Sequence, residues 1–266
     1  MYFGLWASFP IFAVRLNYLA ATLNFPLQDR IFARADSGLG FDWLTWSSFA
    51  WSHPWFINVL IWAYQSNIYQ PFILVCVFAF LGPRGRNREL LTATMFAYFQ
   101  TLVISAVLPA FGPNRVYGFP SQWDSILQAL RAGTHIPLHY VGIVTFPSFH
   151  ASMAVILTAA LRGNRYGFAT ALVVNGLMLL ATVPIGYHYL VDIIAGCVIA
   201  IGSLYTARLT ETRATLLDHQ FPHSGDDRFS RSRTASAPHE REHDRPHDGG
   251  CTEREGGEIA GALVPK

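Results

Sequence analysis

The sequence predicts an all-α fold, a polytopic integral membrane helical bundle of about six transmembrane helices followed by a disordered C-terminal tail. Composition is the first reason: 52% of the 266 residues are hydrophobic and only 14% are charged, whereas a soluble domain carries about a quarter charged residues. The second is that several apolar stretches reach the roughly 20 residues that a helix needs to cross a bilayer. The third is that residues 208–266 hold 20 of the 36 charged side chains.

The same counts exclude several classes of protein. A chain so poor in charge and so rich in Phe, Trp and Tyr is neither a soluble enzyme nor a disordered scaffold. Its net charge of +2 is too small to attract nucleic acid. Because Cys76 and Cys197 lie in apolar runs, the three cysteines predict neither a disulfide framework nor a zinc pattern.

Six stretches are predicted to span the membrane. Four are clear: residues 54–81, 90–111, 168–185 and 189–207. The stretch 149–161 is shorter, and we interpret it as a spanning helix that starts within the headgroup region. The sixth, residues 3–23, contains Pro10 and Arg15. A cleaved signal peptide is the alternative there, but no basic segment precedes the apolar run, so a membrane helix is favoured.

These stretches divide the chain into three parts. Residues 1–24 form an N-terminal membrane helix, residues 25–207 form the membrane core, and residues 208–266 form the charged tail. The tail has few large apolar side chains, so burial cannot offset the entropy of ordering it. Its histidines recur every four residues, at His239, His243 and His247, but their polar, proline-containing surroundings favour solvated low-complexity sequence over a metal site.

Arginines predict how the bundle is oriented. They gather in two short connections, residues 82–88 and 162–165, and at the start of the tail. Short loops rich in Lys and Arg stay in the cytoplasm, so we expect a cytoplasmic tail and an integral membrane protein of the bacterial inner membrane. Residues 24–53 and 112–148 then lie on the non-cytoplasmic side.

Those two non-cytoplasmic segments are not plain linkers. Residues 24–53 are rich in Trp and Phe, as is typical of a membrane interface. Residues 121–133 predict a capped helix that ends at a glycine.

One acidic residue lies well inside an apolar run. Asp192 follows His188 by four residues, which places the two side chains one helical turn apart. A carboxylate there can accept the proton of one imidazole nitrogen and leave the other nitrogen free as a nucleophile. A polar contact between packed helices explains the pair equally well.

A second histidine stands in a short motif. Residues 147–150 read Pro-Ser-Phe-His, in which Pro147 suits the first turn of a helix and Ser148 can donate its hydroxyl. Free backbone N–H groups at such a helix start bind anions. We expect His150 to lie at the same membrane face as His188.

Together the two motifs resemble a known family. Residues 145–152, Thr-Phe-Pro-Ser-Phe-His-Ala-Ser, and residues 186–192, Gly-Tyr-His-Tyr-Leu-Val-Asp, are similar to the second and third signature blocks of the type 2 phosphatidic acid phosphatase and vanadium haloperoxidase superfamily. They resemble most the inositolphosphotransferase-like branch, which includes inositol phosphorylceramide synthases. The resemblance covers roughly residues 25–207 and is strong in the two motifs.

This resemblance implies a two-step phosphoryl transfer. His188 would attack phosphorus and become phosphohistidine, Asp192 would orient and stabilise it, and His150 would protonate the leaving oxygen. Ser148 would bind a non-bridging phosphate oxygen. The implied partners are the bilayer and a phosphorylated lipid or isoprenoid substrate. No metal or other cofactor is expected, because histidine is itself the nucleophile.

The chain departs from the superfamily pattern at two phosphate-binding cations. Its one lysine is Lys266, so the lysine of the first block is missing, and Ala181 and Thr182 stand where the third block has Ser-Arg. The candidates to bind phosphate instead are Arg115 and Arg131. Three further residues are weaker candidates, which anchoring at the interface explains adequately: His139, Tyr187 and Tyr189.

Two other functions remain open. A membrane metalloenzyme would use His150, His188 and Asp192 as metal ligands. A transporter would use the His–Asp pair as a proton relay, although its polar residues would then be expected near the bilayer midplane. The sequence does not decide which lipid is the substrate, whether water or an alcohol accepts the phosphoryl group, or the oligomeric state.

Overall fold

The computed structural model describes residues 2–81, 85–119, 123–134 and 145–220. Within them every regular element is a helix, which confirms the all-α prediction. The helices are α1 (Tyr2–Ala21), α2 (Asp29–Gly38), α3 (Trp43–Ser52), α4 (Pro54–Phe80), α5 (Arg86–Val107), α6 (Pro113–Val116), α7 (Trp123–Arg131), α8 (Phe149–Ala160), α9 (Arg165–Thr182) and α10 (Leu190–Gln220). His139 and the tail histidines lie outside the described residues.

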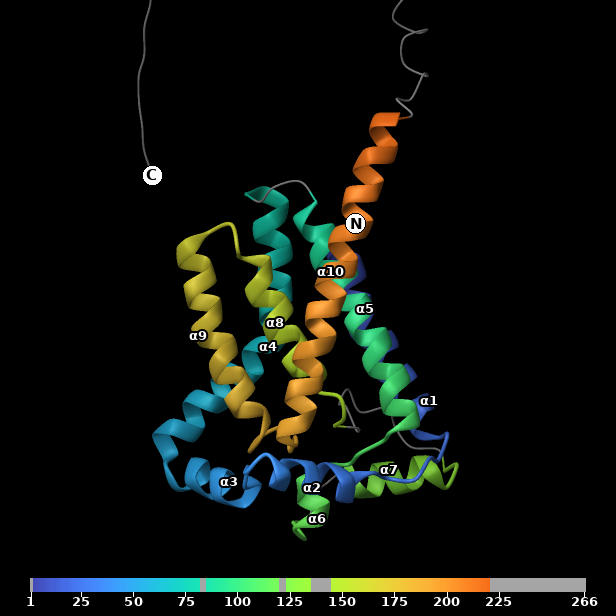
Figure 1. Ribbon diagram of the computed structural model, residues 1–266, viewed down its shortest axis with the longest axis vertical. Coiled ribbons are helices and arrows are strands. Elements are labelled where there is room, and N and C mark those ends of the chain that lie inside the picture. Colours follow the sequence, from blue (N-terminus) through green and yellow to red (C-terminus); the bar gives the residue numbers. More distant parts are fainter. Residues whose placement is uncertain (1, 82–84, 120–122, 135–144, 221–266) are drawn as a thin grey trace, which may run out of the picture. The chain divides into compact units, whose positions relative to one another are not determined.

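All six predicted spans form helices, namely α1, α4, α5, α8, α9 and α10, and Figure 1 shows them running along the long axis of the bundle. Three of them, α5, α9 and α10, are long and apolar enough to cross a membrane. The helix α8 is apolar but has only 12 residues. The helices α1 and α4, of 20 and 27 residues, are long enough but are not among those three. Membrane crossing by these last three stays a prediction.

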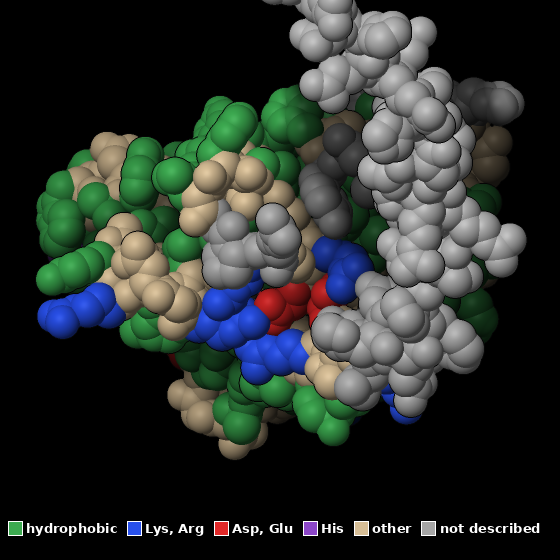
Figure 2. All heavy atoms as spheres, turned by 90° about the horizontal axis from the view of Figure 1, so that it is seen from above, with side chains coloured by type: hydrophobic (Ala, Val, Ile, Leu, Met, Phe, Trp, Pro, Cys, Tyr) green, Lys and Arg blue, Asp and Glu red, His purple; other side chains and the backbone are tan. Residues whose placement is uncertain are grey.

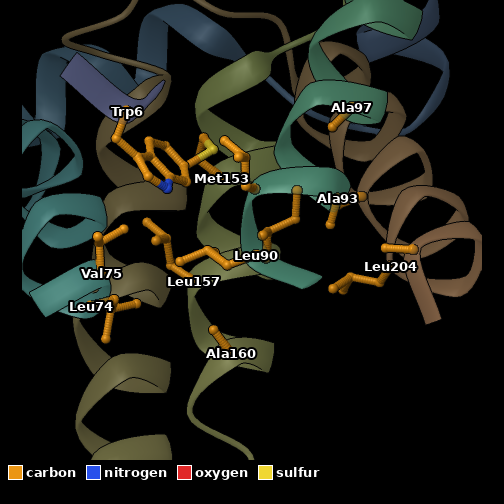
Figure 3. Packing of buried hydrophobic residues seen from close by; sticks show 14 of the residues in the cluster. Trp6, Leu74, Val75, Leu90, Ala93, Ala97, Met153, Leu157, Ala160 and Leu204 are labelled. Carbon is orange, nitrogen blue, oxygen red and sulfur yellow. The ribbon is translucent and has the colours of Figure 1, made fainter. Parts of the chain in front are cut away.

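The largest hydrophobic cluster lies between α1, α4, α5, α8 and α10. Figure 3 shows Trp6, Leu90, Leu157 and Leu204 packed together there, with the small side chain of Ala93 between helices. Small residues allow helix backbones to approach closely, and such packing holds membrane helices together where apolar burial cannot.

Large apolar side chains also cover the outside of the bundle. Examples from four helices are Trp62, Phe99, Val173 and Ile201, each more than half exposed. In water such a surface would aggregate, whereas in a bilayer it faces lipid.

Three short helices, α2, α3 and α7, cross one end of the bundle (Figure 1). Asp42 caps α3 by accepting hydrogen bonds from the backbone N–H groups of Leu44 and Thr45. The helix predicted within residues 121–133 is α7, and Gly133 follows it with a φ of +68°. The histidine-bearing starts of α8 and α10 lie at this same end.

The opposite end of the bundle carries arginines. Glu89 on α5 accepts hydrogen bonds from Arg162 (2.6 Å) and from Arg208 on α10 (3.1 Å), and Arg88 pairs with Glu211. Figure 2, which looks onto this end, shows blue and red side chains gathered together. The arginine-bearing connections therefore meet at one end, as predicted. The helix α10 continues through this end to Gln220, past the expected start of the tail.

Candidate active site

The starts of α8 and α10 are joined directly. The backbone N–H of Ser148 donates to the carbonyl of Asp192 over 3.0 Å. A Cβ atom on Gly196 would lie 2.2 Å from the carbonyl oxygen of Ser148, so only glycine allows the two helices to approach this closely. This contact brings the Pro-Ser-Phe-His motif beside the His188 motif.

His188 is held between a carboxylate and a hydroxyl. Its Nδ1 lies 3.3 Å from Oδ2 of Asp192, and its Nε2 lies 3.4 Å from Oγ of Ser148. The same Oδ2 accepts a hydrogen bond from the backbone N–H of Tyr189 at 3.0 Å. Both members of the His–Asp pair are buried. With Nδ1 donating to the carboxylate, Nε2 carries the lone pair and faces the start of α8.

Burial also sets the charge of this imidazole. It lowers the pKa of His188 to about 4, because the interior disfavours the charged form. At neutral pH the ring is therefore uncharged, as a nitrogen nucleophile must be.

His150 stands in the first turn of α8, beside His188. The two ring centroids are 6.2 Å apart and the planes are inclined at 65° to each other. On its other side, His150 stacks on Tyr64 of α4, with centroids 4.5 Å apart and an angle of 20° between the planes. The sequence did not single out Tyr64, because nothing distinguishes it from the other aromatic residues of residues 54–81.

The structure thus brings together Ser148, His150, His188 and Asp192, four of the six predicted site residues. A family model described as the PAP2 superfamily matches residues 30–206, more than half of the chain. The chain belongs to the PAP2 superfamily. The comparisons with curated proteins and with solved structures found no match. Members of the PAP2 superfamily are phosphatases and phosphoryl transferases, so the protein is a membrane enzyme of this type.

The two predicted arginines lie at the same end of this PAP2 protein, on α6 and α7. Arg115 is exposed and, with residues 27–31 and Val116, lines a groove of about 430 Å³. Its positive charge favours the ionised form of the nearby Asp29 carboxyl group and so works to lower the pKa of that group. Arg131 donates a hydrogen bond to the carbonyl of Phe25 over 2.6 Å. Phosphate binding by both arginines stays a prediction.

The weaker candidates have structural contacts. Tyr187 has a positive φ of 52° and lies near Trp43, and the hydroxyl of Tyr189 donates to Asp29. Metal ligation finds no support in the described part of the chain, where no three His, Cys, Asp or Glu side chains are grouped closely enough to hold an ion.

Two buried acids of α2 complete the surroundings of the site. Asp36 accepts hydrogen bonds from the backbone N–H groups of Leu190 and Val191, and Asp29 accepts from those of Phe111 and Gly112. Burial raises the pKa of both carboxyl groups. The sequence does not single out these acids, although a spacing of seven residues, two helical turns, places them on one face of a helix.

Proposed function

We propose that the protein transfers the phosphoryl group of a phosphorylated lipid, or of a lipid-linked phosphodiester, through a phosphohistidine on Nε2 of His188. The observation that carries this proposal is the buried His188–Asp192 pair, with Nε2 facing Ser148 at the start of α8. Membership of the PAP2 superfamily supports it.

In the first step, the Nε2 lone pair of His188 attacks phosphorus, and the bond between phosphorus and the leaving oxygen breaks. The negative charge of the bound phosphate favours the protonated form of His150, which gives its proton to that oxygen, and the oxygen leaves as a hydroxyl group. Asp192 stabilises the positive charge that the imidazole ring acquires. Ser148 and the free N–H groups in the first turn of α8 bind the non-bridging oxygens, where transition-state charge accumulates.

In the second step, an acceptor hydroxyl gives its proton back to His150 and attacks phosphorus. The bond between phosphorus and Nε2 breaks, and His188 returns to its neutral form. If the acceptor is water the protein is a phosphatase, and if it is an alcohol the protein is a transferase.

The residues of the two histidine motifs, and the absence of the lysine and arginine that the superfamily uses to bind phosphate, favour the inositolphosphotransferase-like branch. This branch implies an alcohol acceptor. In this proposal, Arg115 and Arg131 bind phosphate in place of the missing lysine and arginine. The exposed Arg115 beside its groove suits this role better than Arg131, whose guanidinium already binds Phe25. Weaker vanadate inhibition of Arg115→Ala than of Arg30→Ala, an arginine of the same groove, would support the assignment to Arg115, and equal inhibition would remove it.

We also place the site at the non-cytoplasmic membrane surface. It lies at the end of the bundle opposite to the arginine-bearing connections, which the positive-inside rule assigns to the cytoplasm.

The decisive experiment traps the intermediate. Purified protein is mixed with phospholipid and isoprenoid phosphates labelled with ³²P, with and without inositol, and quenched in alkali, in which phosphohistidine survives. Label on the wild-type chain but not on His188→Ala supports the mechanism, and label retained by His188→Ala overturns it. The ratio of transfer product to free phosphate identifies the acceptor.

A further inference from the structure

We propose that α2 positions the nucleophile: Asp36 and Asp29 hold the backbone on both sides of His188 and act as positioning residues for the reaction. This inference rests on the proposed function, because it assigns a role in that same site. Neither carboxylate touches the His188 ring, so their effect passes through the backbone that carries it.

Asp36 fixes the start of α10. Its two oxygens accept hydrogen bonds from the backbone N–H groups of Leu190 (2.8 Å) and Val191 (3.0 Å). A helix leaves its first N–H groups without partners, and a residue just before the helix usually caps them. Here the cap comes from a different helix. The start of α10, and with it Asp192, is therefore held relative to α2.

Asp29 acts on the residues around His188 less directly, through the neighbouring backbone of Phe111 and Gly112 and through the Tyr189 side chain. Its Oδ1 accepts from the N–H groups of Phe111 (2.9 Å) and Gly112 (2.8 Å) and from the hydroxyl of Tyr189 (3.2 Å). Gly112 in turn packs so tightly on Tyr187 that a Cβ there would lie 2.5 Å from the Tyr187 carbonyl oxygen. One carboxylate thus restrains the residues on both sides of His188.

The helix α2 also contacts the other histidine-bearing segment. Phe32, between the two acids, stacks on Phe146 with ring centroids 4.1 Å apart. Phe146 comes two residues before Ser148. A single helix therefore touches both segments whose relative placement sets the distances from His188 to its two partners.

Those distances tolerate little change. At 3.3 Å and 3.4 Å, the contacts of His188 with Asp192 and Ser148 are near the upper limit for a hydrogen bond. A displacement of the first turn of α10 by a fraction of an ångström would break the contact with Asp192. The proton of His188 would then no longer be held on Nδ1, and both tautomers would form.

The test compares Asp36→Ala and Asp36→Asn with Asp42→Ala, all in the full-length chain. Asp42 also caps a helix by accepting backbone hydrogen bonds, but on α3, which carries no proposed site residue, so it controls for the loss of a cap as such. We expect Asp36→Ala to lower kcat about 100-fold, as displacements of about 1 Å do, with KM changed less than about twofold. Asn keeps one acceptor oxygen and should fall between Ala and wild type. Asp29→Asn should lower kcat in the same way.

A second readout does not depend on turnover. In ¹⁵N spectra of histidine-labelled protein, His188 of the wild type and of Asp42→Ala should be a single tautomer protonated at Nδ1, whereas Asp36→Ala and Asp36→Asn should show both tautomers. An unchanged tautomer in both Asp36 variants, or an unchanged kcat in folded Asp36→Asn and Asp36→Ala, would overturn the inference. If the wild type shows no phosphoryl transfer, but the Asp36 variants still lose the tautomer preference that the wild type has, the proposed function is wrong and the positioning contact stands.

Discussion

The two ends of the bundle both hold buried acids, but they hold them differently. At the arginine end, Glu89 is bound by the side chains of Arg162 and Arg208, which are themselves partly exposed. At the histidine end, Asp36 and Asp192 are bound by backbone N–H groups and an imidazole ring. Side-chain pairs join helices whose backbones can still adjust, whereas backbone donors fix the backbone itself. We therefore expect changes at the first end to alter stability and changes at the second to alter rate.

The largest expected effect is that of His188→Ala. Removing the nucleophile should lower kcat on the order of 10⁵-fold, to background, while the protein still inserts into the membrane. Phosphate release from a lipid phosphate, normalised to the amount of membrane protein, measures this. Activity close to wild type would remove His188 from the chemistry, and the contrast between the two ends would lose its basis.

Substitution of Gly196 should affect rate and stability together. In Gly196→Ala the new methyl group would meet the Ser148 carbonyl at 2.2 Å, which forces α8 and α10 apart and costs about 1–3 kcal/mol of unfolding free energy. Gly202→Ala is the matched control on the same helix, since its Cβ would meet nothing within 4 Å. Thermal unfolding in detergent and kcat should both fall in the first variant and stay unchanged in the second. Equal behaviour of the two variants would contradict the close contact.

Glu89→Gln tests the arginine end. The amide cannot pair with both arginines as the carboxylate does, so we expect a loss of about 1–2 kcal/mol in stability, with kcat within about twofold of wild type. Denaturation midpoints and turnover of the same preparation provide the two measurements. A large fall in kcat without a change in stability would show that the two ends are coupled more tightly than their contacts indicate.

The smallest effect is expected from mild acid. An exposed histidine with a pKa of about 6.5 becomes mostly protonated between pH 7 and 6. Because burial lowers the pKa of His188 to about 4, its imidazole stays neutral and nucleophilic over this interval and becomes protonated only as the pH approaches 4. The rate of phosphoenzyme formation should therefore change little from pH 7 to 6, because the nucleophile stays in its neutral form. A fall with a midpoint near 6.5 would mean that the ring is solvated.

The sequence predicts those parts of this protein that depend on local spacing. The apolar run 54–81 matches α4 almost to the residue, because Pro54 starts the helix. The run 90–111 is displaced against α5, since the polar residues from Arg86 to Glu89 are helical and the helix ends at Val107, ahead of Pro109.

Within the site, contacts between neighbours in sequence are likewise predictable. His188 and Asp192, four residues apart, are in contact as expected, but the predicted shared helical turn is wrong, because α10 begins only at Leu190 and His188 lies in the non-helical segment before it. The roles of Asp29, Asp36 and Tyr64 do not follow from the sequence, because their partners lie far away in sequence and only the packing of α2 and α4 against the site brings them there.

The length of α10 has a consequence for the depth of the site. Asp192 and Arg208 lie 16 residues apart, which is about 24 Å along a helix that rises 1.5 Å per residue. A hydrocarbon core is about 30 Å thick. With Arg208 at one surface of the membrane and the helix upright, Asp192 lies about 6 Å beneath the other surface. His188, four residues nearer that surface than Asp192, then lies at the depth of the lipid headgroups, so a lipid phosphate can reach it without leaving the plane of its neighbours.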